Sequence, residues 1–457
     1  MLQIKNKQTK GWVRDFLYPK KPSGKLYNYR KWVSYALLLA LFSFPLLRLN
    51  DEQLILLNFI ERKFVLFGLI FTPQDFYLFA LAMLIFVIFI VCFTVILGRL
   101  WCGWACPQTI FMEMVFRRIE YWIEGDVARQ KRLNAQEWNA EKIIKKGSKH
   151  FIFFILSFAI ANTFLAYIIG TEKLFEVITE PINRHWSGFI SIWFFTAAFY
   201  LVFAYLREVV CTVICPYGRL QSVLLDNQSL IVAYDENRGE PREKIKKDSE
   251  NSKRGECVDC GLCVQVCPTG IDIRNGTQLE CVNCTACIDA CDEVMFKINK
   301  PKRLIGFYNH DFVDNGKSFK IGLKAYSYAA VLFTILFIFS ALIYKRESVE
   351  TTILRASGTL YQVRGKYFTS NLYNAELINK TNKIFRFQFR AKDNNDQIEF
   401  IQNANILPKE SSVHITFFLI RKNKLIKAYK SDAAFEVVAG GKILSNSSTS
   451  FFAQPAD

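Results

Sequence analysis

The sequence predicts a multi-domain membrane protein with about five membrane-spanning helices, a small cysteine-rich α+β module and a C-terminal all-β domain. Three observations predict this class. The chain of 457 residues is 51% hydrophobic and contains 42 Phe, which exceeds what one soluble core uses. All thirteen cysteines lie at or before Cys291. Residues 345–457 carry short alternating or β-branched apolar runs separated by Asn, Asp, Lys and Gly, the pattern of strands and turns.

Five apolar stretches approach the about 20 residues that a helix needs to cross a bilayer. They are Trp32–Leu47, Phe76–Leu97, Phe151–Gly170, Gly188–Leu206 and Ala325–Tyr344. A further stretch, Phe64–Thr72, is too short to span, so we expect it to lie in the interface or to re-enter the membrane.

The net charge of +17 is distributed as the positive-inside rule requires, which excludes nucleic acid as the main reason for it. Residues 1–31 and 99–150 are strongly basic, whereas the loops 48–75 and 171–187 hold few basic residues and several acids. The basic segments are therefore expected in the cytoplasm. Counting spans from there places residues 207–323 inside and residues 345–457 outside, and cysteine usage agrees because reduced thiolates suit a reducing compartment.

These observations give five expected regions. The first two are a basic cytoplasmic tail at 1–31 and a four-helix membrane domain at 32–206, which includes an amphipathic cytoplasmic segment at 99–150. The third is a cytoplasmic region at 207–323 that contains the cysteine-rich module at 250–300. The last two are a fifth transmembrane helix at 324–344 and a periplasmic immunoglobulin-like β-sandwich at 345–457.

The module contains two cysteine runs of identical spacing. They are Cys257-x2-Cys260-x2-Cys263-x3-Cys267-Pro268 and Cys281-x2-Cys284-x2-Cys287-x3-Cys291. This spacing is that of bacterial ferredoxins, in which the fourth cysteine of each run ligates the other cluster. One [4Fe–4S] cluster is therefore expected on Cys257, Cys260, Cys263 and Cys291, and a second on Cys281, Cys284, Cys287 and Cys267. Structural zinc is the alternative, but zinc knuckles separate two cysteine pairs by a longer loop. The runs predict an electron-transfer protein.

Four more cysteines form a repeated C-x3-C-P motif. Cys102 and Cys106 follow the second span, and Cys211 and Cys215 follow the fourth. On one helix, positions i and i+4 share a face, so each pair could present two sulfurs to one centre. The thiols could hold copper, cycle between dithiol and disulfide, or ligate a further metal centre. The alternative is that they are small buried packing residues.

The order of these motifs resembles one known family. A Gly-Arg-x2-Cys-Gly-Trp-x-Cys-Pro-Gln segment (Gly98–Gln108) precedes Cys211–Tyr217, the double cluster run with Cys287–Met295, a last span and a β-rich domain. This is similar to the cytochrome c oxidase accessory proteins called CcoG, FixG or RdxA. The resemblance implies a multi-pass protein of the bacterial inner membrane with an immunoglobulin-like C-terminal domain. It also implies reduction of Cu(II) to Cu(I) for the copper centre of a cbb-type oxidase, with Cys102, Cys106, Cys211 and Cys215 as the catalytic, copper-binding thiols.

Partners implied by the resemblance are membrane lipid, oxidase assembly factors and a copper chaperone or transporter; the electron donor and a homodimer stay open. Two other functions compete with the cupric reductase. One is a quinol-linked relay to a respiratory reductase, since related membrane ferredoxins share the C-x3-C-P pairs. The other is a non-enzymatic assembly scaffold in which the clusters sense redox state.

Overall fold

The computed structural model describes residues 17–455 except 50, 72–74, 227, 245–253, 310–311, 313–321, 357 and 359. The first half of the predicted basic tail and the most charged part of the segment leading into the module lie outside the described residues. The chain divides into two compact units. Unit 1 comprises Met1–Phe44, Met83–Ala166 and Thr171–Leu336, and unit 2 comprises Pro45–Ala82, Tyr167–Gly170 and Phe337–Asp457.

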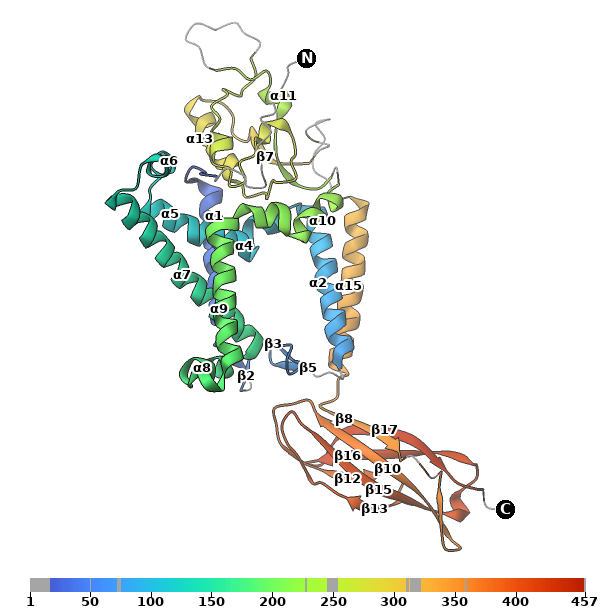
Figure 1. The fold of residues 1–457 in the computed structure, drawn as a ribbon. Helices are drawn as coiled ribbons and strands as arrows, with labels where there is room; N and C mark the ends of the chain where they lie inside the picture. The colour runs from blue at the N-terminus through green and yellow to red at the C-terminus, as the bar shows by residue number, and fades with distance from the viewer. Residues whose placement is uncertain are drawn as a thin grey trace. The chain divides into compact units, whose positions relative to one another are not determined.

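Four helices in the described part of the chain are long and apolar enough to cross a membrane (Figure 1). They are α2 (Phe76–Leu97), α7 (Ala140–Ile169), α9 (Trp186–Leu201) continued by the π-helical turn η4 (Val202–Leu206), and α15 (Leu323–Tyr344). They correspond to four of the five predicted spans. The remaining one, Trp32–Leu47, overlaps α1 (Lys25–Ser43), which begins and ends earlier than expected and carries Lys25, Arg30 and Lys31 in its first half. These charges lower its mean hydropathy below that of a spanning helix.

In unit 1, short helices follow the two spans that precede the C-x3-C-P motifs. After α2 come α3 (Leu100–Trp104), α4 (Pro107–Ile110), the π-helix η2 (Phe111–Phe116), α5 (Arg117–Ile123) and α6 (Val127–Ala135). After η4 come a second π-helix, η5 (Val210–Ile214), and α10 (Pro216–Leu224). The helix α8 (Thr171–Thr179) and the 3₁₀ turn η3 (Ile182–Arg184) connect α7 to α9.

The cysteine-rich module is a small α+β fold, as predicted. Strand β6 (Ile231–Tyr234) pairs antiparallel with β7 (Ile305–Tyr308), so the chain enters and leaves the module side by side. Between them lie α11 (Glu236–Gly239), α12 (Leu262–Gln265), η6 (Ile273–Asn275) and α13 (Ala286–Lys297). A compact apolar core that includes Ile288 and Met295 of α13, Leu304 and Ile305 anchors the loops that carry the cysteines.

The C-terminal part of unit 2 is all-β, as predicted. One sheet has the order β13–β15–β10–β8, with β9 also paired to β10, and a second has the order β12–β16–β17. The 3₁₀ turn η7 (Asn423–Leu425) lies between β15 and β16, and β11 pairs with β14. The strands are β8 (Val349–Arg355), β9 (Gln362–Arg364), β10 (Phe368–Asn379), β11 (Phe385–Arg386), β12 (Gln388–Ala391), β13 (Gln397–Gln402), β14 (Ile406–Leu407), β15 (Ser412–Lys422), β16 (Lys430–Ala439) and β17 (Lys442–Phe452). Alternate residues of facing strands, such as Phe417 of β15 and Phe435 of β16, pack together in one core.

Unit 2 also contains the loop that precedes α2. The stretch Phe64–Thr72, which we expected to lie in the interface or to re-enter the membrane, supplies strands of a small antiparallel sheet as far as Phe71, and its depth in a membrane stays a prediction. That sheet is β3 (Ile55–Asn58), β4 (Lys63–Leu66) and β5 (Leu69–Phe71), beside the pair β1 (Arg48–Leu49) and β2 (Glu52–Gln53). Buried Asp75 then pairs with Arg346 and Lys380, each at 2.6 Å, which joins the loop to the C-terminal domain. Leu56, Val65 and Ile70, one from each strand, form the buried core of this sheet.

Candidate iron–sulfur and thiol sites

The two cysteine runs adopt the same backbone. The residues before and after the second cysteine have positive φ in both runs, namely Asp259 (50°) and Gly261 (67°) in the first, and Asn283 (52°) and Thr285 (66°) in the second. Each run then enters a helix, α12 or α13, that carries its third cysteine in the first turn. Left-handed residues at equivalent positions coil both loops so that their thiols face inward.

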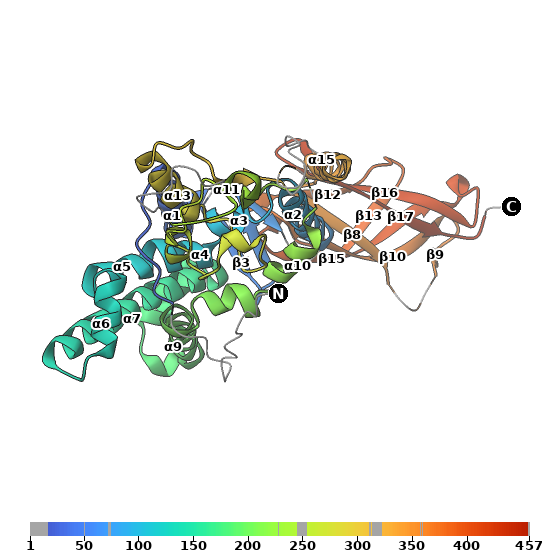
Figure 2. The ribbon, with the colours of Figure 1, turned by 90° about the horizontal axis from the view of Figure 1, so that it is seen from above.

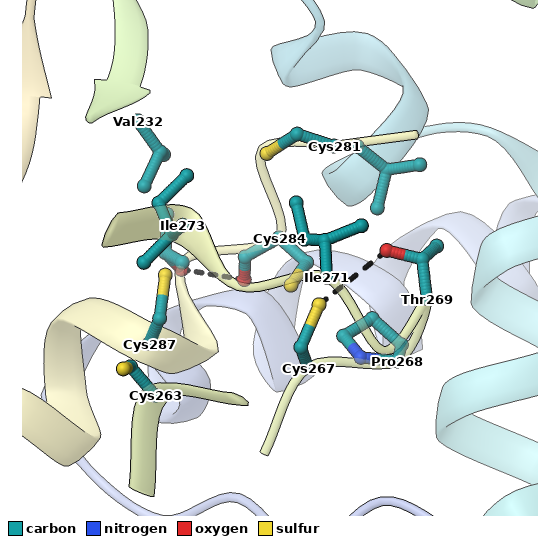
Figure 3. Close-up of a pocket in the computed structure, with 12 residues that line it drawn as sticks. Val232, Cys263, Cys267, Pro268, Thr269, Ile271, Ile273, Cys281, Cys284 and Cys287 are labelled. Carbon is teal, nitrogen blue, oxygen red and sulfur yellow. Dashed lines mark hydrogen bonds between the residues drawn. The ribbon is translucent and has the colours of Figure 1, made fainter. Parts of the chain in front are cut away.

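One cavity, of about 350 Å³, has Cys267, Cys281, Cys284 and Cys287 in its wall (Figure 3). We call it the proximal cavity because it adjoins the C-x3-C-P segments. Apolar side chains from β6, η6 and the intervening loop complete its lining. They include Val232, Ile271 and Ile273.

A second cavity, of about 390 Å³, has Cys257, Cys260, Cys263 and Cys291 in its wall, and we call it the distal cavity. Cys263 also lies on the wall of the proximal cavity, so the two spaces are neighbours. Cys260 is solvent-exposed. The structure thus brings together each set of four cysteines that the spacing predicted, one set around each cavity.

The donor sets fit an iron–sulfur group. Burial raises the pKa of Cys281 to about 12 and that of Cys284 to about 11, so a thiolate there needs compensating positive charge. Backbone N–H groups of Asn283 and Ala286 donate to these sulfurs and favour the thiolate. Among the described residues, no three His, Cys, Asp or Glu side chains converge on a point suited to a single ion. The cysteines instead stand four around each cavity, the number of cysteine ligands that one [4Fe–4S] cluster takes.

The C-x3-C-P motif has the same local structure in both copies, but not the one expected. Cys102 lies in α3 and Cys211 in η5, whereas Cys106 and Cys215 are extended N-cap residues of α4 and α10, each followed by Pro at the first helical position. The two cysteines of a pair therefore lie on either side of a helix break. The expectation that they share one helical face is wrong, because the proline starts a new helix at the second cysteine.

The four C-x3-C-P thiols nevertheless lie near one another. Burial, together with a smaller effect of neighbouring thiols of the quartet, raises the pKa of Cys102 and of Cys211 to about 12. Cys102 Sγ donates to Gln221 Oε1 at 3.1 Å, which links the first motif to the helix that follows the second. Cys106 accepts from backbone N–H groups of Gln108 and Thr109. The Cys102 and Cys211 thiols, with pKa values of about 12, are protonated at neutral pH unless a cation displaces the proton.

A third cavity, of about 320 Å³, lies beside this quartet, and we call it the thiol pocket. Its wall includes Cys211, Thr109 and Met112 from the C-x3-C-P segments. Three further residues of its wall, Pro268, Thr269 and Val282, also line the proximal cavity. The thiol pocket and the proximal cavity are therefore separated by one layer of side chains, whereas the distal cavity shares no lining residue with the thiol pocket.

Direct contacts hold the C-x3-C-P segments against the second cysteine run. Gly103 packs so closely that a Cβ there would clash with the carbonyl oxygens of Val282 and Asn283. The buried Arg99 guanidinium donates to the carbonyl oxygen of Gly218, just after the second C-x3-C-P motif, and to that of Leu279, just before the second cysteine run. Arg30 Nε of α1 donates to the Gly103 carbonyl at 2.7 Å. Glycine and arginine at these positions thus bring the cluster loop and the thiol helices into backbone contact.

A network of buried ion pairs borders the thiol pocket, and it was not foreseen from the sequence. Arg117, with 1% of its side chain exposed, pairs with both Glu113 and Glu208. Arg207 pairs with Glu120 at 2.6 Å and has a φ of 47°, a strained value for a bulky residue. The sequence did show one sign of this network, because an arginine, Arg99 or Arg207, precedes each C-x3-C-P motif. It did not show the acidic partners, because Glu113 of η2 and Glu120 of α5 reach the arginines only through the tertiary fold.

Three family descriptions match parts of the chain. A 4Fe–4S dicluster domain matches residues 206–310, and a 4Fe–4S binding domain matches residues 79–130 and 185–226, which contain the C-x3-C-P motifs. The third, an IG-like fold at the C-terminus of FixG, a putative oxidoreductase, matches residues 339–454.

Curated proteins match about two-thirds of the chain. The chain is 37% identical to protein RdxB and 35% identical to protein RdxA of Cereibacter sphaeroides, covering 64% of this chain and 62% of each relative. It is 36% identical to the nitrogen fixation protein FixG of Rhizobium meliloti, covering 64% and 57%. The chain thus spans about three-fifths of the length of these relatives. A crystal structure of a FixG-related protein from Vibrio parahaemolyticus aligns at 14% identity with a TM-score of 0.21, covering 23% of this chain and 97% of that one.

Proposed function

This chain belongs to the FixG and RdxA family of iron–sulfur electron-transfer proteins, and we propose that it is a membrane-bound cupric reductase. In this proposal the substrate is Cu(II), the product is Cu(I), and each copper ion takes up one electron. The Cu(I) would serve assembly of the copper centre of a cbb-type cytochrome oxidase, with assembly factors and a copper chaperone or transporter as partners.

The proposed ligands are the two cysteine sets that surround the two cavities. Cys257, Cys260, Cys263 and Cys291 would hold one [4Fe–4S] cluster, and Cys267, Cys281, Cys284 and Cys287 the other. Bound there, each cluster would accept and release a single electron, which matches the one-electron demand of Cu(II). The apolar walls of the proximal cavity exclude water from the sulfurs, and the backbone N–H groups of Asn283 and Ala286 stabilise their negative charge.

One observation carries the assignment of a soft-metal substrate to Cys102, Cys106, Cys211 and Cys215. The thiol pocket, which Cys211 of this quartet lines, shares Pro268, Thr269 and Val282 with the wall of the proximal cavity, so one layer of side chains separates the two spaces. Thiolate and thioether sulfur are the ligands that select Cu(I), and Cys211 and Met112 both line the pocket.

The proposed sidedness has the N-terminus and the module in the cytoplasm and the C-terminal domain in the periplasm. Segments expected on the same side make contact with each other, which supports this arrangement. Arg30 of the N-terminal helix contacts Gly103, and the loop before α2 contacts the C-terminal domain through Asp75 and Arg346. In sealed spheroplasts, added protease is expected to release a cysteine-free fragment beginning near Glu347. Release of that fragment only after the membrane is opened contradicts the sidedness.

Copper reduction by anaerobically purified, pre-reduced protein tests the activity. The Cys102/Cys106/Cys211/Cys215 quadruple serine variant is expected to keep both clusters and lose stoichiometric copper binding and Cu(I) production. Cys92→Ser is the matched control, because Cys92 is a buried thiol within the span α2, outside both motifs. Unchanged Cu(I) production by the quadruple variant would refute the proposed role of the four thiols.

The match of a 4Fe–4S binding domain to the two C-x3-C-P segments favours a second candidate. The quartet would then hold an additional iron–sulfur centre, and the protein would relay electrons without binding copper. The iron content separates the two candidates. About eight iron atoms per chain agree with the copper reductase, and about twelve agree with the relay.

A further inference from the structure

Thr269 lies between the proximal cavity and the thiol pocket. Its side chain is buried, with 6% of the residue exposed, and it lines both the proximal cavity and the thiol pocket. Its hydroxyl lies 3.4 Å from Cys267 Sγ, as the dashed line in Figure 3 shows. The hydroxyl therefore touches a sulfur of the proximal set from the side that faces the C-x3-C-P thiols.

The direction of this hydrogen bond follows from the proposed ligand set. A free thiol could donate or accept, but a cysteine that ligates iron is a thiolate and has no proton to donate. Thr269 is then the donor. Hydrogen bonds to cluster sulfurs stabilise the more negative, reduced state and so raise the reduction potential.

The equivalent position in the other run has the opposite character. Cys267 is followed by Pro268 and Thr269, whereas Cys291 is followed by Asp292 and Glu293. The Asp292 carboxylate follows Cys291 directly in the chain and so places a negative charge beside the distal set. A nearby negative charge disfavours an added electron just as it disfavours a thiolate.

Charges from the packed elements reinforce this difference. At the proximal set, Arg99 Nη1 lies 3.5 Å from the Cys281 carbonyl oxygen, and Arg30 of α1 donates to the carbonyl of Gly103, which packs against Val282. At the distal cavity, Arg274 is the cation, but Asp272 and Asp259 pair with it at 2.7 and 2.6 Å. Positive charge is therefore better compensated by carboxylates at the distal cavity than at the proximal one.

We propose that Thr269 is a positioning residue that raises the reduction potential of the proximal cluster above that of the distal cluster. The electron then settles next to the thiol pocket, and the exposed edge at Cys260 faces the donor. This inference rests on the proposed ligand sets but not on copper as the substrate.

A redox titration of anaerobically purified full-length protein, followed by electron paramagnetic resonance and without copper, tests the proposal. Thr269→Val removes the donor at nearly constant volume, and Thr269→Ser retains it. We expect one midpoint to fall in T269V by an amount equal to about a tenfold change in the electron-transfer equilibrium, or about 59 mV. The other midpoint should stay constant, and T269S should behave as the wild type.

Three results would overturn the proposal: both midpoints unchanged in T269V, both midpoints lowered together, or T269S lowered as much as T269V. If T269V does not assemble two clusters, Thr269→Ala removes the same hydroxyl without adding a methyl group against the wall, and the same outcomes apply. Failure of the ligand sets would appear separately, as fewer than about eight iron atoms in the wild type. Failure of the copper proposal would leave the titration unchanged.

Discussion

The two cysteine runs share one backbone and differ in their surroundings. Both turn through left-handed residues on either side of the second cysteine and then start a helix. The run that begins at Cys281 lies against Gly103 and Arg99 of the thiol segments, whereas the run that begins at Cys257 exposes Cys260 to solvent. Ligand spacing thus determines the shape of the loop, and the neighbouring chain determines the role that each site takes.

Serine substitution of single ligands should break this comparison most strongly. Cys284→Ser and Cys260→Ser are each expected to remove about four of about eight iron atoms and all copper reduction, while the spans still insert. The two variants should lose different paramagnetic signals. Retention of both clusters in either variant, measured by spectroscopy, contradicts the ligand sets.

Gly103→Ala should affect the second run alone. A methyl group there clashes with the backbone of Val282 and Asn283, so the proximal loop must shift away from α3. We expect a changed or lost proximal signal and an intact distal signal. Gly147→Ala is the matched control, since its Cβ meets nothing within 4 Å and alanine favours the interior of α7. Equal spectra for the two variants would show that the contact at Gly103 is dispensable.

The left-handed residue after the second cysteine offers a smaller, reciprocal test. Gly261 and Thr285 have nearly the same φ, yet only glycine adopts it without strain. Gly261→Thr should cost about 1–2 kcal/mol and lower the thermal midpoint, because no contact blocks the new side chain. Thr285→Gly should raise the thermal midpoint or leave it unchanged. Relief of the backbone strain raises it, and loss of the hydrogen bond from the Thr285 hydroxyl to the Cys284 carbonyl at 2.6 Å offsets that gain. Lower thermal midpoints in both variants would mean that the two loops are not equivalent.

Asp292→Asn should give the smallest change. In the wild type, the Arg303 backbone N–H donates to Asp292 Oδ1 at 2.7 Å. Asparagine keeps an acceptor for this hydrogen bond but removes the negative charge beside Cys291. The distal midpoint should rise by less than about 59 mV, and the gap between the two clusters should narrow. A fall in the distal midpoint would mean that Asp292 acts through the loop structure and not through its charge.

The sequence predicted the parts of the molecule that local pattern determines. Ligand spacing grouped Cys267 with the second run, and period-2 alternation located strands such as β15. The prediction failed where one residue changes the local geometry, as Pro107 does by starting a new helix after Cys106. It could not locate Gly103 against Val282, or Arg117 between Glu113 and Glu208, because these contacts join segments far apart in the chain.

The small sheet before α2 teaches the same lesson. Apolar content suggested a membrane-associated stretch. In the structure, Val65 of β4 and Ile70 of β5 lie opposite each other across the strand pair and are buried together. Asp75 is stable in a buried position because Arg346 and Lys380, about three hundred residues away, supply two positive charges. Neither partner is visible in the local sequence.

Iron and acid-labile sulfide analysis of anaerobically purified protein tests the central claim most directly. If the eight cysteines around the two cavities hold two cubane clusters, each chain should contain at least about eight iron and eight sulfide. Zinc bound in their place, with no labile sulfide, would contradict the account and leave a metal-stapled membrane protein without electron transfer.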